Sequence, residues 1–152
     1  MPFIASSRYA WVIILAGTND ILHNSGHSSK KAWDTAVHNI INLHIMSHRF
    51  GAKSVAVTIP EMDCEESDKP PCQHARLERQ YINEKIRHYA RTNEFTILCD
   101  LATKLPRYSL KNEERNQFWE EDLHMKPAGY ERMAEIIYRD LLLHIDDEES
   151  LK

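Results

Sequence analysis

The chain has 152 residues, a length that suits one domain, and its 42% hydrophobic content is enough for a buried core. A formal net charge of -4 argues against a nucleic-acid partner, because phosphate binding needs a basic face. No apolar run reaches the roughly 20 residues that span a bilayer. We therefore expect a soluble and, by default, cytoplasmic protein, with the condition that a lost N-terminus would have carried any signal peptide away.

Apolar runs that predict strands alternate with patterns that predict helices. The continuous run Trp11–Ala16 is typical of a strand that is covered on both faces. Pro127 suits the first turn of a helix, and Gly51 suits the end of one. The further strands are predicted at 54–59 and 95–101, and the helices at about 30–50, 73–91 and 127–145. Such alternation predicts a single α/β domain over residues 1–152 with a parallel sheet.

Three polar stretches connect these elements, and a charged tail follows them. We expect a polar loop at 17–29, an acidic loop with two prolines at 61–72, and a long, mostly polar connection at 103–120. The tail from about residue 146 is acidic and is expected to fray. In open parallel sheets, ligands bind beyond the carboxyl ends of the strands. The loops that follow the strands are therefore where we look for a site.

The tetrapeptide Gly17-Thr18-Asn19-Asp20 directly follows the first predicted strand. The Asn19 amide could donate a hydrogen bond to a developing oxyanion, which can be worth roughly 10²–10³ in rate. Asp20 could hold the turn through hydrogen bonds to backbone N–H groups. The alternative is ordinary turn chemistry, which Asn-Asp dipeptides often supply in loops.

A second cluster lies just before the last predicted helix, where His124 follows Glu120, Glu121 and Asp122. Histidine titrates near neutral pH, so it can act as a general base without large tuning. A nearby carboxylate can hold the imidazole in the required tautomer. The alternative is a solvated loop histidine beside surface acids.

Taken together, the two clusters resemble the SGNH (GDSL-type) ester hydrolases. Residues 11–21, WVIILAGTNDI, are similar to the family's block III, a hydrophobic strand ending in Gly-Thr-Asn-Asp. Residues 118–130, FWEEDLHMKPAGY, are similar to block V, with an acid three residues before His and then Pro-x-Gly-Tyr. The resemblance implies a flavodoxin-like three-layer α/β/α fold and acyl-ester hydrolysis without a cofactor. It also implies that Asn19 is an oxyanion donor, that His124 is the base and that Glu121 orients it, with Gly17, Thr18 and Asp20 shaping the turn.

The sequence departs from the family pattern around the catalytic groups. The family's acid is usually Asp, so Glu121 places its carboxylate differently and Asp122 is an alternative acid. The nucleophilic Ser of the family lies in a Gly-Asp-Ser motif, which occurs nowhere in this chain. We therefore identify no nucleophile, expect the first two strands of the fold to be lacking, and expect little activity from this chain alone. A non-catalytic binding fragment is the alternative function.

The resemblance also indicates where a substrate and a partner would lie. In the family, the loop after this second strand often borders the substrate cleft, so Glu61, Met62 and Cys64 are candidate lining residues for a small acyl-ester substrate. The missing first strand of the family would pair with Trp11–Ala16. Without it, this hydrophobic segment becomes a sheet edge, which favours pairing with another copy of the chain.

Metal and disulfide sites are not predicted. His44 and His48 are four residues apart on a predicted helix, but no third ligand is evident, so we expect a partly exposed helix face. Cys64, Cys72 and His74 match no standard zinc spacing. We interpret Cys64 and Cys72 as two loop thiols, while their pairing under oxidising conditions stays open.

Overall fold

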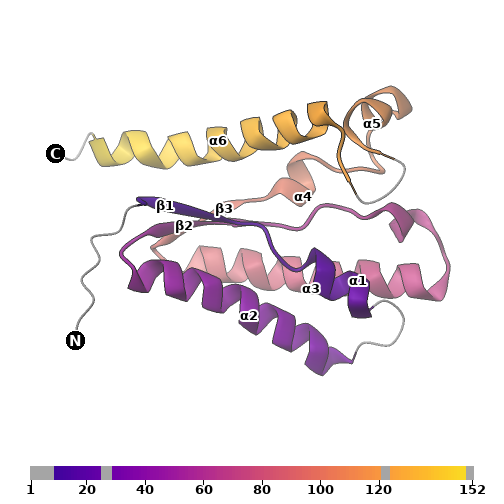
Figure 1. The fold of residues 1–152 in the computed structure, drawn as a ribbon, viewed down its shortest axis with the longest axis horizontal. Coiled ribbons are helices and arrows are strands. Elements are labelled where there is room, and N and C mark those ends of the chain that lie inside the picture. The colour runs from indigo at the N-terminus through magenta and orange to yellow at the C-terminus, as the bar shows by residue number, and fades with distance from the viewer. Residues whose placement is uncertain (1–8, 25–28, 121–123, 150–152) are drawn as a thin grey trace.

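The computed structural model describes residues 9–24, 29–120 and 124–149. In this part of the chain, a three-stranded parallel sheet lies between two helical layers (Figure 1). The sheet order is β1-β2-β3, and the strands are β1 Trp11–Ile14, β2 Lys53–Val57 and β3 Thr96–Cys99. The predicted α/β fold with a parallel sheet is therefore confirmed.

Three long helices cover the sheet, and shorter ones lie in its connections. The long helices are α2 Lys30–Arg49, α3 Pro70–Thr92 and α6 Pro127–Glu149. The short ones are α1 Thr18–Asn24, the 3-10 helix η1 Asp63–Glu66, α4 Leu101–Lys104 and α5 Asn112–Phe118. The predictions of plain loops at 17–29 and 61–72 were therefore wrong where α1, η1 and the first turn of α3 lie. A single fully buried side chain among the described ones, Ile21, anchors α1 in the core. Leu22 beside it is 41% exposed, so the seven residues carry no helical apolar period.

The central strand β2 shows why the sheet needs helices on both faces. Its side chains alternate, as in any strand: Ala56 belongs to the cluster shared with α1, α2 and α3, whereas Val55 and Val57 belong to the cluster shared with α6. All three are at most 1% exposed. A strand buried on both faces reads as a continuous apolar run, which is how the sequence predicted it.

The long helices are amphipathic and have clear ends. The buried face of α2 contains Ala36, Ile40 and His44, which are spaced by four residues. The helix ends at Arg49, and Gly51 follows with a φ of 79°. That conformation is left-handed and favours glycine, as predicted for the end of this helix.

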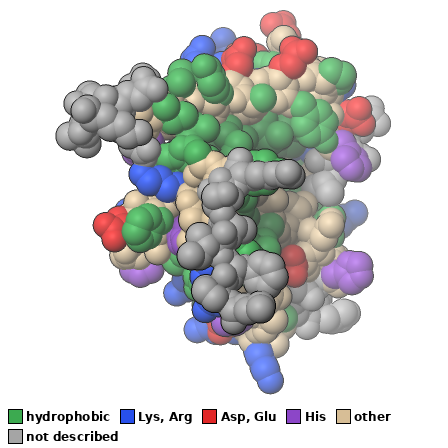
Figure 2. Space-filling view, turned by 60° about the vertical axis from the view of Figure 1, so that its left-hand side comes forward, with side chains coloured by type: hydrophobic (Ala, Val, Ile, Leu, Met, Phe, Trp, Pro, Cys, Tyr) green, Lys and Arg blue, Asp and Glu red, His purple; other side chains and the backbone are tan. Residues whose placement is uncertain are grey.

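One face of the molecule is rich in apolar side chains. Within the described ranges, β1 pairs with β2 alone, so its other edge faces outward. The side chain of Ile13 in β1 is 50% exposed, and that of Leu143 in α6 is 69% exposed. Figure 2 shows hydrophobic side chains gathered at the height of α6 and β1. Among the described helices, none is long and apolar enough to cross a membrane.

Candidate functional site

A cavity of about 260 Å³ lies where the carboxyl ends of β1 and β2 meet the segment before α6. Asn19 and His124 both line it, and both are exposed to solvent. The structure thus brings the two sequence clusters to one cavity, which we call the Asn19–His124 cavity. Its other polar lining residues are Thr18, Glu61 and Tyr130, and its apolar ones are Leu15, Pro60, Met62, Trp119, Met125 and Met133.

Gly17 positions Asn19 by turning the chain from β1 into α1. Its φ is +110°, and a Cβ at this position would lie 2.8 Å from Cδ1 of Ile59. The positive φ favours glycine, whereas the close contact is with the end of a flexible side chain, which can shift. The carbonyl of Gly17 accepts the first helical hydrogen bond, from Ile21 N at 3.1 Å, which places Asn19 in the first turn of α1.

The role proposed for Asp20 in this turn stays a prediction. The Asp20 side chain is exposed and makes no hydrogen bond with any described residue, and it does not line the cavity. The predicted tie to the turn is therefore not seen among these residues. A carboxylate in the first turn of a helix still interacts favourably with the helix dipole.

A short antiparallel contact positions His124. Trp119 and Met125 form an isolated β-bridge, and Glu120 N donates to the carbonyl of His124 at 3.0 Å. These bonds hold the backbone of His124 beside the end of α5. The histidine therefore projects from a fixed backbone at the rim of the cavity.

Gly129 brings the first turn of α6 against the same segment. A Cβ at Gly129 would lie 2.2 Å from the carbonyl oxygen of Phe118, a contact that no side chain can make. Lys126 N donates to that same oxygen at 2.9 Å. The Pro-x-Gly-Tyr motif is therefore a packing requirement that brings α6 close behind His124.

The residues predicted to complete the site are not all described. Glu121 and its alternative Asp122 lie outside the described residues. Among the described residues that line the cavity, none is a serine. The catalytic roles assigned to Asn19, His124 and Glu121 therefore stay predictions.

Buried polar groups hold the cavity wall that follows β2. Met62 N donates to Oε1 of Glu65 at 2.9 Å, and Glu65 receives two 2.6 Å hydrogen bonds from Arg79. The amide of Asn83 pairs with the backbone of Ile59, accepting from its N–H at 2.7 Å and donating to its carbonyl at 2.9 Å. Sequence reasoning missed these residues. The available signal was two polar residues, four apart, on the apolar face of a helix.

Tyr108 ties this wall to the segment before α5. Its hydroxyl donates to the carbonyl of Met62 at 2.7 Å, and its backbone N–H donates to Glu61 at 3.0 Å. Burial raises the pKa of Tyr108 to about 12. Glu61 and Met62 line the cavity as predicted, whereas Cys64 does not and lies beside a neighbouring hollow.

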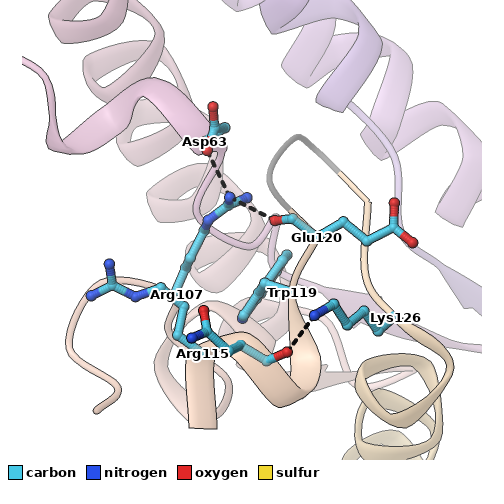
Figure 3. A pocket seen from close by; sticks show the side chains of 7 residues that line it. Asp63, Arg107, Arg115, Trp119, Glu120 and Lys126 are labelled. Atoms are coloured by element: carbon cyan, nitrogen blue, oxygen red, sulfur yellow. Dashed lines mark hydrogen bonds and ion pairs between the residues drawn. The ribbon is translucent and has the colours of Figure 1, made fainter. Parts of the chain in front are cut away.

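A second cavity, of about 980 Å³, adjoins the first (Figure 3). Trp119 lines both cavities. Arg107 donates to Asp63 at 2.6 Å and to the backbone carbonyl of Glu120 at 3.0 Å, and its guanidinium lies 5.4 Å from the centre of the Trp119 ring. We call this second cavity the basic pocket; its principal lining residues are Asp63, Arg107, Arg115, Trp119, Glu120 and Lys126.

Another polar cluster lies at the opposite, amino end of the strands. Oγ of Ser54 is 2.8 Å from Nδ1 of His44, 3.0 Å from Nε2 of His48 and 3.0 Å from Oγ1 of Thr96. Burial, together with the charge of the neighbouring His48, lowers the pKa of His44 to about 4. The prediction of a partly exposed helix face was wrong for His44, which is 1% exposed. Its partners come from β2 and β3, and helical spacing does not reveal them.

The three cysteines are free thiols. Cys64 is exposed, whereas Cys72 and Cys99 are buried. Burial, followed by a hydrogen bond with Cys72, raises the pKa of Cys64 to about 12. A high thiol pKa lowers reactivity, because the thiolate is the nucleophile. In the described part of the chain, no group of three or more His, Cys, Asp or Glu residues could hold a metal ion.

Comparison with known proteins identifies the family. The family model of GDSL-like lipases and acylhydrolases matches residues 2–132. A crystal structure of a GDSL-like lipase from Bacteroides thetaiotaomicron VPI-5482 superposes with a TM-score of 0.66 at 21% identity, over 86% of this chain and 60% of that one. This likeness shows a shared fold, and no curated protein matches the chain. The chain belongs to the GDSL-like lipase/acylhydrolase family.

Proposed function

We propose that this chain forms the part of an acyl-ester hydrolase site that binds the oxyanion and carries the general base. One observation supports this proposal above the others: Asn19 and His124, which are far apart in the sequence, line the same small cavity. That cavity lies at the carboxyl edge of a parallel sheet, where ligands of such folds bind. Membership of the GDSL-like family makes ester hydrolysis the expected chemistry.

In the proposed reaction, a serine hydroxyl attacks the ester carbonyl carbon while His124 takes its proton. The Asn19 amide donates a hydrogen bond to the oxyanion that develops on the carbonyl oxygen. The C–O bond to the alcohol then breaks, and His124 returns the proton to the departing oxygen. Water repeats the sequence on the acyl-enzyme and releases the acid. Glu121, or Asp122 in its place, is proposed to orient His124.

The 152 residues contain no Gly-Asp-Ser motif, so they do not identify the serine of this reaction. The proposal therefore assigns the nucleophile to a Gly-Asp-Ser segment supplied from elsewhere. Without a nucleophile, a serine hydrolase loses on the order of 10⁶ in turnover and keeps only what the oxyanion site and binding provide. For the chain alone, this leaves slow attack by water activated at His124.

Hydrolysis of p-nitrophenyl acetate by the purified chain tests this proposal. We expect a slow rate above buffer that His124→Ala abolishes and that Asn19→Ala lowers about tenfold or more. His88→Ala is the matched control, because His88 is exposed on α3 and does not line the cavity. Equal rates for the His124 and His88 variants would mean that surface imidazoles account for the hydrolysis, and would contradict the proposal.

A Gly-Asp-Ser segment added upstream of residue 1 gives the stronger test. We expect turnover to rise by several orders of magnitude and to require both the new serine and His124. The control carries Gly-Asp-Ala in the same segment. If the two extended proteins hydrolyse the ester at the same rate, the assigned nucleophile is wrong.

The absence of Gly-Asp-Ser from this sequence also favours a second candidate, a non-catalytic fragment that binds a ligand in the same cavity. A serine-directed fluorophosphonate probe separates the two functions. Labelling of any serine in the purified chain excludes the binding fragment. No labelling, together with saturable ligand binding that Asn19→Ala weakens, supports it.

A further inference from the structure

The basic pocket departs from the acidic character of the chain. The formal net charge is -4, yet three cationic side chains, Arg107, Arg115 and Lys126, line this single cavity. Two carboxylate residues, Asp63 and Glu120, also line it. The sign of the electrostatic field inside the pocket therefore depends on which of the three cations form ion pairs with carboxylates.

The carboxylates balance one of the three cations. Oδ1 of Asp63 lies 2.6 Å from Nη2 of Arg107, so these two charges form a pair. Glu120 offers Arg107 only its backbone carbonyl, at 3.0 Å. Figure 3 shows the Glu120 carboxylate directed away from the Arg107 guanidinium. Asp63 is therefore the carboxylate that neutralises Arg107.

Arg115 has no carboxylate at hydrogen-bonding distance among the described residues. Its Nη2 donates to the backbone carbonyl of Tyr108 at 3.0 Å, which carries no net charge. Its Nη1 lies 3.8 Å from Oε2 of Glu66, beyond hydrogen-bonding distance. The Glu66 side chain is 66% exposed, so solvent screens this pair strongly.

Lys126 is in the same situation as Arg115. Its ammonium donates to the backbone carbonyl of Asn116 at 2.6 Å. No ion pair joins Lys126 to a carboxylate in the part of the chain that the structure describes. Among the described carboxylates, only the exposed Glu66 forms an ion pair with Arg115, at 3.8 Å, and none forms one with Lys126, so the positive charge of the pocket is only weakly balanced.

Two residues that line this pocket each have a buried N–H donor that lacks an acceptor. Nε of Arg115 and Nε1 of Trp119 are buried without a hydrogen-bond partner among the described residues. Trp119 is only 4% exposed. Buried donors in folded proteins are almost always paired, so an unpaired one indicates a place for an acceptor. An oxyanion is an acceptor that also carries the charge that Arg115 and Lys126 favour.

We propose that the basic pocket binds an anionic group, a carboxylate or a phosphate, on the ester whose carbonyl lies in the Asn19–His124 cavity. Trp119 lines both cavities, so the two are neighbours, and the proposal places one molecule across them. A guanidinium binds such oxyanions with high geometric specificity. The inference rests on the proposed function and extends it: the substrates are esters with an anionic group near the scissile bond.

Binding of small anions, measured by isothermal titration calorimetry, tests the pocket without turnover. The probes are inorganic phosphate and succinate, with dimethyl succinate as the neutral counterpart. We expect saturable binding of at least one anion, weakened tenfold or more by Arg115→Ala/Lys126→Ala, and no binding of the neutral diester. Saturable binding of phosphate alone or of succinate alone identifies which group the pocket takes. If neither anion binds, or if the double variant binds as tightly, the proposal is overturned.

Matched variants separate loss of the site from loss of the fold. Lys85→Ala/Arg91→Ala removes one lysine and one arginine from α3, outside the pocket, and should leave anion affinity unchanged. Arg115→Lys retains the charge and should recover part of the affinity. The thermal unfolding midpoint of each variant shows whether it is folded. A control double variant that weakens binding equally would mean that general charge, and not the pocket, binds the anion.

Hydrolysis of two phenyl esters distinguishes failure of this inference from failure of the proposed function. We expect His124-dependent hydrolysis of monophenyl succinate to exceed that of phenyl acetate at equal low concentrations, and Arg115→Ala/Lys126→Ala to remove the difference. Equal rates for both esters, still dependent on His124, overturn the anionic substrate and leave the proposed function standing. Anion binding without any His124-dependent hydrolysis contradicts the proposed function and with it the ester substrate.

Discussion

The two ends of the sheet carry similar side chains in different surroundings. At the amino ends, His44, His48, Ser54 and Thr96 form a hydrogen-bonded group, and Ser54 is fully buried. At the carboxyl ends, His124 lies at the rim of a cavity. A search for a serine beside a histidine would select the amino end.

Accessibility is the difference that matters for function. A buried serine that already shares its hydroxyl with two imidazoles and a threonine cannot be reached by an ester carbonyl, so we interpret that cluster as structural. The Asn19–His124 cavity is accessible, and its polar groups converge on empty volume.

The largest loss of stability is expected when the buried ion pair behind the wall of the Asn19–His124 cavity is broken. Glu65→Leu leaves Arg79 buried without its carboxylate and removes the acceptor of Met62 N. Breaking one half of a buried pair typically lowers the free energy of unfolding by about 3–5 kcal/mol, and urea denaturation measures this loss. We expect Glu65→Leu/Arg79→Leu to recover a large part of it, because no unpaired charge then remains.

The matched control for this pair lies on the surface of α3. Arg91 and Glu84 are 3.3 Å apart, and both side chains are more than half exposed. Glu84→Leu should change the free energy of unfolding by less than about 1 kcal/mol. If Glu65→Leu is as mild as Glu84→Leu, the wall of the cavity does not depend on the buried pair.

The next effect concerns pH and the amino-end cluster. Because burial lowers the pKa of His44 from 6.5 to about 4, the unfolded chain takes up a proton before the folded one does. Stability is therefore complete above about pH 6.5 and falls as the pH drops to about 4. The linkage amounts to about 3 kcal/mol. Urea denaturation at several pH values between 7 and 4 measures it.

His44→Gln is the decisive variant for this pH dependence. Glutamine can still bond to Ser54 but does not titrate, so the slope between pH 6.5 and 4 should become shallower. His88→Gln, on the exposed face of α3, should leave the slope as it is in the natural chain. A natural chain with equal stability at pH 7 and pH 4.5 would show that His44 is not held neutral by the fold.

A smaller loss is expected from Ser54→Ala. The variant removes the hydroxyl shared by His44 and His48 and takes away the partner of the buried Nδ1 of His44, whereas Nε2 of His48 keeps Thr96 at 3.2 Å. The free energy of unfolding should fall by about 1–3 kcal/mol. The rate of p-nitrophenyl acetate hydrolysis should stay unchanged, because Ser54 lies at the opposite end of the sheet from His124. A proportional loss of hydrolysis at a temperature where the variant is folded would make Ser54 part of the reaction.

The sequence predicted the elements whose signal is periodic or continuous. Strands β1 and β2 read as apolar runs, and α2 and α6 show an apolar residue every three or four positions. The short helices α1 and α5 were missed. Ile21 is the single fully buried residue of α1, and α5 has none, so neither helix carries a hydrophobic period. Tertiary contacts, not local pattern, determine where such helices form.

The sequence predicted that Asn19 and His124 lie close together, because the order of strands and helices determines where each residue falls. Asn19 and His124 come after strands or before a helix at one edge of a parallel sheet, and this places them together. The supports of the site were not predictable in the same way. Glu65 and Arg79 are fourteen residues apart and meet only after α3 folds back along the wall. Likewise, the hydrogen bonds of Ser54 join three elements of the fold, and none of them is visible from one segment.

The smallest effect on stability is expected from a substitution in β1. The same strand also tests whether the Asn19–His124 cavity stays accessible in solution. Its free edge carries the exposed Ile13, and Leu15 at its carboxyl end lines the Asn19–His124 cavity. A hydrophobic edge favours pairing with a second copy. We therefore expect light scattering to give a mass above 17.8 kDa that rises with concentration. Ile13→Lys should restore the monomer, because a charge on an edge strand opposes pairing, while changing the free energy of unfolding by less than about 0.5 kcal/mol. A natural chain that stays monomeric at all concentrations would show that this edge is not used and that Leu15 remains accessible to ligands.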